Sequence, residues 1–263
     1  MRGEWSPPQR AKRAYRREQV AMKPALFASD LHLAPSRPGT AAAFHAWARG
    51  PAREAGSVRI LGDLFDTWIG DEGIDEPFAA AVIESLRSIA DAGVELGVMR
   101  GNRDFLLGTR FAQAARATLL PERAVVDAGG VPTLILHGDE LCTDDVAYQR
   151  YRAWTRDPVR QRRFLALPWP VRRAVAAWAR RRSRQATRNK PDSIMDVNAQ
   201  AVARAFRDAG TIRMVHGHTH RPASHRHDVD GRPCERHVLS DWRDRATWLE
   251  AGTDGIRPRE LSP

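Results

Sequence analysis

The sequence contains few cysteines and no long apolar run. Two cysteines, Cys142 and Cys234, stand in a chain of 263 residues, which excludes a disulfide-built scaffold and indicates a reducing compartment. No run approaches the ~18 apolar residues that a membrane-spanning helix needs. Because apolar residues still make up 42% of the chain, a wholly disordered protein is excluded and a buried core is expected.

Lysine is also scarce, and the arginines that replace it are unevenly placed. Three of the 42 basic residues are lysine. Residues 1–20 carry a net charge of +4 and residues 146–190 carry +13, so the remainder of this +10 chain carries −7. A high net charge alone is typical of nucleic-acid-binding proteins. The distribution indicates instead an acidic body with two basic attachments.

The first basic attachment is the N-terminal segment 1–22. It is polar and arginine-rich, and it lacks the apolar stretch of a secretory signal peptide. We expect a disordered tail or an over-called start codon, because Met22 stands directly before the first strand-like run. The alternative is an arm that tethers the chain to an anionic surface. The folded domain is expected over 23–263.

Short apolar runs alternate with helical patterns from residue 23 onward. The periodicity predicts strands at 25–28, 58–61, 94–99, 134–136, 213–215, 236–239 and 247–250. Helices are predicted over 40–48, 78–92, 109–117 and 194–209, the last one ending at Gly210. The alternation indicates an α/β fold in which helices cover the sheet strands.

Polar residues that can bind a metal follow five of these strands. They are Asp30, His32, Asp63, Asn102, His137, His218 and His220. Ligands of open α/β sheets bind beyond the carboxyl ends of the strands, so these side chains are expected to converge on one edge. Asp30 and His32 are two residues apart, which on an extended chain points both side chains the same way. His218 and His220 repeat that spacing.

Together these seven side chains offer imidazole, carboxylate and amide-oxygen ligands. That mixture suits Mn²⁺, Fe²⁺ or Zn²⁺ better than Ca²⁺. Seven ligands are more than one tetrahedral metal site uses, but they fit two ions about 3.5–4 Å apart. Pairs of metal ions at that distance stabilise the attacking and leaving oxygens in displacement reactions at phosphorus. Each motif alone is more often a turn or a polar loop. Their order at successive strand ends predicts a two-metal centre.

The same residues resemble those of the calcineurin-like metallophosphoesterases. A closer resemblance, over residues 25–222, is to the UDP-2,3-diacylglucosamine hydrolases of lipid A biosynthesis. The matching blocks are LFASDLHL from Leu26, LGDLFDTWIGD from Leu61, GNRDFLLG from Gly101, HGDELCTDD from His137, IMDVN from Ile194 and HGHTHRP from His216. The resemblance implies a sandwich of two β-sheets flanked by helices, with a helical cap inserted at about 146–190.

The resemblance also implies how the metals are held. One ion is expected on Asp30, His32, Asp63 and His220, and the other on Asp63, Asn102, His137 and His218. Asp63 then bridges two Mn²⁺ ions, although other divalent metals stay open. Asp104, Asp139 and His216 are candidates to orient these ligands, with structural turns as the alternative.

Arg103 departs from the broad superfamily, in which a histidine usually follows the Gly-Asn pair and can act as a general acid. Arginine cannot donate a proton near neutral pH, but it can bind a phosphate and offset charge in the transition state. A sugar 1-phosphate leaves without a proton, because phosphate monoesters have a second pKa of about 6. Arg103 is therefore the predicted catalytic residue, and it favours pyrophosphate cleavage.

The family's substrate contacts map onto both the body and the cap. The matching residues are Asn102, Arg103, Asp145, Ser183, Thr187, Lys190 and His218. Thr187 stands where the family commonly has asparagine, so its contact is weaker. The cap sequence mixes arginines with Trp169, Trp178 and other apolar residues, a pattern of membrane-interface helices. The alternative is a helical hairpin whose arginines are merely solvated.

The resemblance implies hydrolysis of UDP-2,3-diacylglucosamine by water attack on the α-phosphorus, giving UMP and 2,3-diacylglucosamine 1-phosphate. A cytoplasmic protein attached peripherally to the inner membrane is expected, with neither nucleic acid nor an obligate protein as partner. Two alternatives stay open. One is another two-metal phosphodiesterase acting on nucleotides or nucleic acid, and the other is a metal-free scaffold.

Overall fold

The computed structural model describes residues 23–188 and 194–262, so the expected tail 1–22 lies outside the described residues. The described strands form a six-stranded and a five-stranded sheet. In spatial order the first sheet contains β11 (Gly255–Leu261), β10 (Ala246–Gly252), β1 (Ala25–Ala28), β2 (Ser57–Leu61), β3 (Glu95–Met99) and β4 (Thr118–Leu119). β1 to β4 run parallel, and β10 is antiparallel to both of its neighbours.

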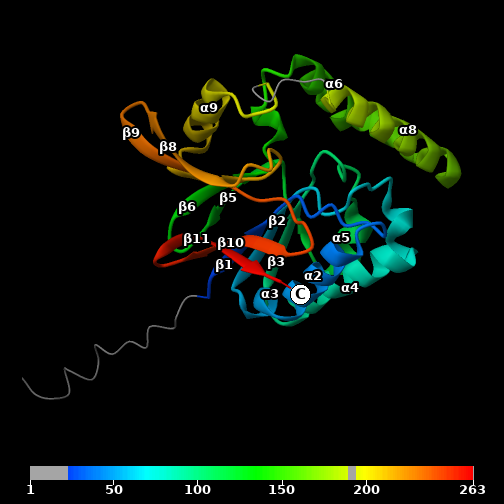
Figure 1. Cartoon of the computed structure of the whole chain (residues 1–263), viewed down its shortest axis with the longest axis horizontal. Helices are drawn as coiled ribbons and strands as arrows, with labels where there is room; N and C mark the ends of the chain where they lie inside the picture. The colour runs from blue at the N-terminus through cyan, green and yellow to red at the C-terminus, as the bar shows by residue number, and fades with distance from the viewer. Residues whose placement is uncertain (1–22, 189–193, 263) are drawn as a thin grey trace, which may run out of the picture.

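The second sheet lies face to face with the first (Figure 1). Its order is β5 (Arg123–Asp127), β6 (Pro132–Leu136), β7 (Arg213–His216), β9 (Arg232–Val238) and β8 (Ala223–Val229). β6, β7 and β9 run parallel, while β5 and β8 pair antiparallel at the two edges. Every predicted strand is confirmed, with ends shifted by up to four residues, whereas β4, β5, β8 and β11 were not predicted.

Alternation along the strands places each apolar side chain in one of two layers. Leu26 and Ala28 of β1 pack against helices, and Phe27 packs between the two sheets. In β6, Ile135 faces the first sheet while Leu134 and Leu136 face a helix on the far side. Because both faces of β1 and β6 are covered, these inner strands are buried along most of their length, as buried parallel strands are, whereas edge strands such as β5 and β8 carry exposed polar residues.

Helices cover the two outer faces, which gives a sandwich of the layers α, β, β and α (Figure 1). The first sheet is covered by α2 (Pro38–Arg49), α3 (Pro51–Glu54), α4 (Pro77–Asp91) and α5 (Thr109–Ala115), and the second by α9 (Ala199–Ala209). Short 3₁₀ turns, η1 (Asp71–Asp75) and η2 (Asp139–Leu141), follow two of the strand-end loops. The predicted α/β fold with flanking helices is confirmed.

The helix expected over 194–209 begins five residues later than predicted. Asn198 is its N-cap, because the side-chain oxygen accepts the backbone N–H groups of Gln200 and Ala201 at 2.9 and 3.1 Å. The predicted end is right, since Gly210 closes the helix with a φ of 64°. Residues 194–198 therefore lie outside the helix.

Between η2 and α9 the described residues form three α-helices: α6 (Val146–Arg156), α7 (Pro158–Leu165) and α8 (Trp169–Arg188). We call residues 146–188 the cap. Pro158 opens α7 and Pro170 lies in the first turn of α8, and residues 166–168 separate the two helices. The helical cap expected at about 146–190 is thus helical over most of its described residues. In Figure 1, α8 extends outward from the sheets as a long arm. Among the described residues, no helix combines the length and apolar character needed to cross a bilayer.

Candidate metal centre

The seven predicted metal ligands lie on loops that follow strands of both sheets. Asp30 and His32 follow β1, Asp63 follows β2 and Asn102 follows β3. The second sheet supplies the remaining three after β6 and β7, namely His137, His218 and His220. The site therefore forms at the seam between the sheets, where the carboxyl ends of their parallel strands meet.

Three of these side chains form one group. The Nε2 atoms of His32 and His220 lie 3.4 Å apart, and His220 Nε2 lies 3.1 Å from Asp30 Oδ1. His32 Nδ1 is buried without a hydrogen-bond partner and lies 3.7 Å from Asp63 Oδ2. Asp30, His32 and His220 can all offer a ligand atom to one point, and Asp63 stands beside them.

The other side chains form a second group around the amide of Asn102. Its Oδ1 lies 3.0 Å from His137 Nε2 and 3.0 Å from His218 Nδ1. His137 Nε2 is also 3.9 Å from Asp63 Oδ1, and Asp63 thus faces both groups. The predicted bridging position of Asp63 agrees with this geometry.

The hydrogen bonds of His137 show that the site fits a cation. Its Nδ1 lies 2.8 Å from the carbonyl of Leu61, which can only accept, so Nδ1 carries the proton. Nε2 is then the nitrogen available to a metal, and it points toward the oxygen of Asn102 at 3.0 Å and the carboxylate of Asp63 at 3.9 Å. An imidazole nitrogen, an amide oxygen and a carboxylate that converge in this way form a donor set that suits a divalent cation. The site is built for divalent metal ions.

The backbone at the ligands differs from the expected one. Asp30, His32, Asp63, His218 and His220 all have φ values between 48° and 68°. The extended geometry predicted for the pairs at 30/32 and 218/220 is therefore wrong. Left-handed backbone at non-glycine residues costs about 1–3 kcal/mol each and is typical of functional sites. The side chains of each pair still converge, because two left-handed residues turn the loop back on itself.

Glycines next to the ligands allow the loops to approach one another closely. A Cβ at Gly101 would overlap the backbone and carboxylate of Asp63. A Cβ at Gly217 would overlap Ser29 and the carboxylate of Asp30. Both positions require glycine because the neighbouring strand ends come into contact there.

Asp104 fastens the loop after β2 to the loop after β3. Its buried carboxylate accepts the N–H groups of Gly101 at 2.7 Å, Leu64 at 2.8 Å and Asp63 at 3.3 Å. These bonds fix the backbone around Asp63 from behind. Asp104 thus stabilises the turn at Gly101 and the backbone around Asp63, which is consistent with both of its predicted alternatives.

Burial and charge shift the protonation of the ligands. Burial, together with the nearby carboxylates of Asp104 and Asp30, raises the pKa of Asp63 to about 7. Burial lowers the pKa of His218 to about 4 and that of His32 to about 3, so both imidazoles are neutral near pH 7. The pKa values of His137 and His220 are instead raised, because the nearby carboxylates of Asp63 and Asp30 outweigh the effect of burial. Metal binding requires all of these groups in their deprotonated forms, so it releases protons from the site.

Arg103 lies beside the bridging carboxylate. Its backbone N–H donates to Asp63 Oδ1 at 2.8 Å, and its guanidinium lies 3.7 Å from Asp63 Oδ2 and 3.3 Å from Asp66 Oδ1. The side chain is 38% exposed, so part of the guanidinium is open to a ligand. An arginine in this position can receive a phosphate next to the metal ligands.

Comparisons with known proteins place the chain in a family. No protein-family model matches it. The UDP-2,3-diacylglucosamine hydrolase of Cellvibrio japonicus is 47% identical over 89% of this chain and 97% of its own length. The proteins of that name from Nitrosococcus oceani and Pseudomonas aeruginosa are 49% and 46% identical, each over 88% of this chain and over 92% and 96% of their own lengths. The chain belongs to the UDP-2,3-diacylglucosamine hydrolase family.

Solved structures show a more distant likeness. An archaeal phosphodiesterase is 12% identical, with a TM-score of 0.45 over 90% of this chain and 99% of its own. A phosphoesterase from E. coli is 16% identical, with a TM-score of 0.40 over 91% and 98%. Because these TM-scores are below 0.5, we infer nothing about the reaction of this protein from these structures.

The substrate contacts that the family resemblance implies lie in different places. Asn102, Arg103 and His218 are in the metal centre, whereas Asp145 caps α6 by accepting the N–H of Tyr148 at 3.0 Å. Ser183 is exposed on α8, and Thr187 lies near the end of that helix. Lys190 lies outside the described residues. These cap positions stay predictions.

Asp66 links Arg103 to the cap, a connection that sequence reasoning missed. One carboxylate oxygen lies 3.3 Å from the guanidinium of Arg103, and the other forms an ion pair with Arg180 of α8. Arg180 also contacts the hydroxyl of Thr67. Asp66 stands inside a matching sequence block, but its partner is 114 residues away, so no local motif could reveal the pairing.

Tyr148 of α6 is a second such link. Its ring lies 5.6 Å from that of His218, centroid to centroid, and its hydroxyl donates to Asp139 at 2.9 Å. Asp139 also accepts from Arg152 at 2.9 Å. The cap is thus packed directly against a metal ligand.

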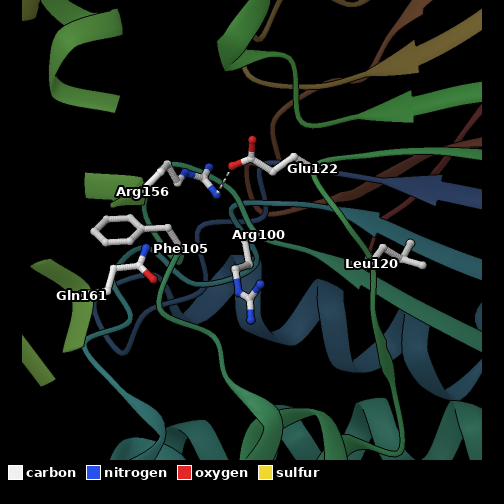
Figure 2. A pocket seen from close by; sticks show the side chains of 6 residues that line it. All are labelled: Arg100, Phe105, Leu120, Glu122, Arg156 and Gln161. Atoms are coloured by element: carbon white, nitrogen blue, oxygen red, sulfur yellow. Dashed lines mark ion pairs between the residues drawn. The ribbon is translucent and has the colours of Figure 1, made fainter. Parts of the chain in front are cut away.

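A cavity of about 130 Å³ lies where the cap meets the loop that carries Asn102 (Figure 2). The residues that line it are Arg100, Phe105, Leu120, Glu122, Arg156 and Gln161. Arg156 pairs with Glu122 at 3.1 Å and donates to the carbonyl of Gly101 at 3.0 Å. In Figure 2 the guanidinium of Arg100 points away from that pair. At this cavity, Arg156 of α6 thus binds the loop that carries Asn102 through the carbonyl of Gly101.

Proposed function

We propose that the protein hydrolyses UDP-2,3-diacylglucosamine by water attack on the α-phosphorus, which yields UMP and 2,3-diacylglucosamine 1-phosphate. The observation that carries the proposal is the position of Arg103, whose partly open guanidinium lies 3.7 Å from the bridging carboxylate of Asp63. The relatives that bear the name UDP-2,3-diacylglucosamine hydrolase support the identity of the substrate.

The metal ligands would hold two ions, and Mn²⁺ is the proposed metal. Asp30, His32, Asp63 and His220 would hold one, and Asp63, Asn102, His137 and His218 the other. When bound, such ions lower the pKa of water and offset the charge of phosphate oxygens. The buried Asp104 and the glycines at 101 and 217 would keep the ligand loops in place during the reaction.

Arg103 would bind the diphosphate and stabilise the charge that develops on it. It lies between Asp63 and Asp66, which hold the guanidinium near the centre while leaving part of it exposed. Arginine has no proton to give near neutral pH. The leaving sugar 1-phosphate needs none, because its second pKa is about 6. The site therefore selects for anhydrides over simple esters.

A cleft of about 370 Å³ between the body and α8 is the proposed site for acyl chains. Apolar side chains line it from both sides, among them Leu33, Phe65, Phe78 and Trp169. Arg173 and Arg180 also line it, and Arg180 reaches the Asp66 that holds Arg103. An apolar cleft that continues toward a diphosphate site suits an acylated sugar phosphate.

The outward face of the cap is the proposed membrane contact. Among the described residues, the exposed large apolar side chains are Val146, Tyr151, Trp154, Val159, Leu167, Val171, Val175 and Trp178 in the cap, and Val125 and Ile212 elsewhere. Val171, Val175 and Trp178 form a stripe on α8, with spacings of four and three residues. Exposed arginines beside such a stripe suit an anionic lipid surface, so we propose peripheral attachment to the inner face of the inner membrane.

The test is turnover of UDP-2,3-diacylglucosamine with Mn²⁺, followed as UMP release in ¹⁸O-labelled water. Label in UMP is expected from attack at the α-phosphorus, and EDTA should abolish turnover. Label in the sugar phosphate would contradict the point of attack. Equal turnover of a UDP-sugar without acyl chains would contradict the lipid substrate and favour a nucleotide phosphodiesterase.

A further inference from the structure

Arg236 of β9 is a buried arginine behind the metal centre. It is 6% exposed, and among the described residues no carboxylate lies within ion-pair distance of it. Its Nη1 donates to His216 Nε2 at 2.9 Å, and its Nε donates to His227 Nε2 at 3.2 Å. The carboxylate of Asp196 favours the charge of Arg236 only from beyond ion-pair distance, so the direct partners of this buried cation are two imidazoles. Such an arrangement is costly to the fold, which indicates another reason for its presence.

The proton of His216 is placed by its two neighbours. A guanidinium can only donate, so His216 Nε2 must accept from Arg236. The carbonyl of Gly217 can only accept, so His216 Nδ1, 2.8 Å away, must donate. His216 is therefore held in the tautomer with its proton on Nδ1, and the carbonyl of Gly217 is held toward the ring.

The residue held in this way begins the loop that carries His218 and His220. Gly217 lies against Ser29 and Asp30 with no room for a Cβ. The next N–H, that of His218, donates to Asp30 Oδ2 at 2.8 Å. The direction of the Gly217 peptide thus sets where the loop meets Asp30 and where the two histidines point.

We propose that Arg236 is a positioning residue for the metal centre. By fixing the tautomer of His216, it orients the Gly217 carbonyl and, through it, the loop of His218 and His220. The inference rests on the proposed two-metal function. Partners one shell beyond the ligands typically change metal affinity or activity by about 10- to 100-fold when they are removed.

The test compares variants of the full chain that differ in the donor at position 236. Arg236→Met removes every donor, while Arg236→Gln keeps one without the charge. Arg226→Met is the matched control, because Arg226 is exposed on β8 of the same hairpin. Each variant is titrated with Mn²⁺ by calorimetry to measure its affinity for the metal. Its unfolding is also followed in EDTA, which measures the stability of the metal-free fold.

We expect R236M to bind Mn²⁺ about 10- to 100-fold more weakly, with kcat reduced by a similar factor and KM little changed. R236Q should recover most of the affinity, and R226M should match the parent. If R236M destabilises the EDTA-treated protein but binds Mn²⁺ with unchanged affinity, Arg236 is structural and the proposal is wrong.

A second measurement does not depend on any variant folding. Nitrogen-15 NMR of the metal-free parent protein should show the His216 proton on Nδ1. A proton on Nε2 in the parent would overturn the proposal. Neither the tautomer nor the Mn²⁺ titration requires a substrate, so an absence of UDP-2,3-diacylglucosamine turnover would contradict the proposed function without contradicting this inference.

Discussion

The metal centre and the cap use charged residues in opposite ways. In the centre, Asp30, Asp63 and His137 are at most 3% exposed, on loops fixed by buried hydrogen bonds and left-handed backbone. In the cap, many of the arginines stand exposed along regular helices. Exposed ion pairs contribute about 0–1 kcal/mol each, so these arginines add little to stability. The centre therefore depends on fixed geometry, whereas the exposed arginines of the cap are available for the proposed contact with a membrane.

The comparison predicts the largest effect at the bridging ligand. Asp63→Asn should lower kcat by about three orders of magnitude or more, because several kcal/mol of transition-state stabilisation depend on the ligand that faces both groups. Steady-state kinetics in Mn²⁺ and metal analysis of the purified protein would measure this. Asp254→Asn is the control, since that side chain is 80% exposed. Near-normal turnover of D63N would refute the shared-ligand model.

Arg103 should show the next largest effect, because it lies at the centre without being a ligand. Arg103→Ala should reduce kcat by about 10²–10³-fold, the usual effect of removing one group that stabilises transition-state charge. Metal content should stay unchanged, and Arg103→Lys should restore part of the rate. A loss of bound metal in R103A would show that Arg103 stabilises the metal site, and would contradict its proposed role in binding the phosphate.

Arg180 should affect binding more than chemistry, because it reaches the centre only through Asp66. Arg180→Ala should raise KM for the acylated substrate by about tenfold, the effect of a lost charged hydrogen bond. The control is Arg182→Ala. The guanidinium of Arg182 lies 5.3 Å from the ring centre of Trp178, on the outward face of α8 and away from Asp66. An unchanged KM together with a large loss of kcat would place Arg180 in the chemical step.

The smallest effect on turnover is expected at the outward stripe of the cap. Trp178→Glu should reduce binding to anionic vesicles by about tenfold while leaving turnover of detergent-dispersed substrate unchanged. Val125→Glu is the control, because Val125 is 50% exposed on β5, outside the cap. Equal vesicle binding by W178E and the parent would exclude this stripe as the membrane contact.

The sequence predicted the features that depend on neighbouring residues. The buried strands were readable because apolar residues run through them without interruption, as in 25–28 and 134–136. β5 was missed because exposed and half-buried positions alternate along it, as expected at a sheet edge. The early start predicted for α9 failed because Asn198 is a cap, which the apolar periodicity of the segment does not reveal.

For the site, residue types and order were predictable, but backbone conformation and long-range pairs were not. The positive φ values at Asp30 and His32 come from contact with the loop at Asp63, whose carbonyl accepts the His32 N–H at 2.9 Å. The pairing of Asp66 with Arg180 and that of Arg236 with His216 join distant segments. Such contacts are set by tertiary packing, on which local sequence patterns carry no information.

The order of the first sheet has a consequence for synthesis on the ribosome. β1 lies between β2 and β10, and β10 spans Ala246–Gly252 near the end of the chain. At about 5–20 residues per second, one edge of β1 stays unpaired for roughly 10–40 s after it is made. An open strand edge can pair with another chain, and a strand of four residues offers little length for that. The shortness of β1 thus protects the nascent protein until its last hairpin closes the sheet.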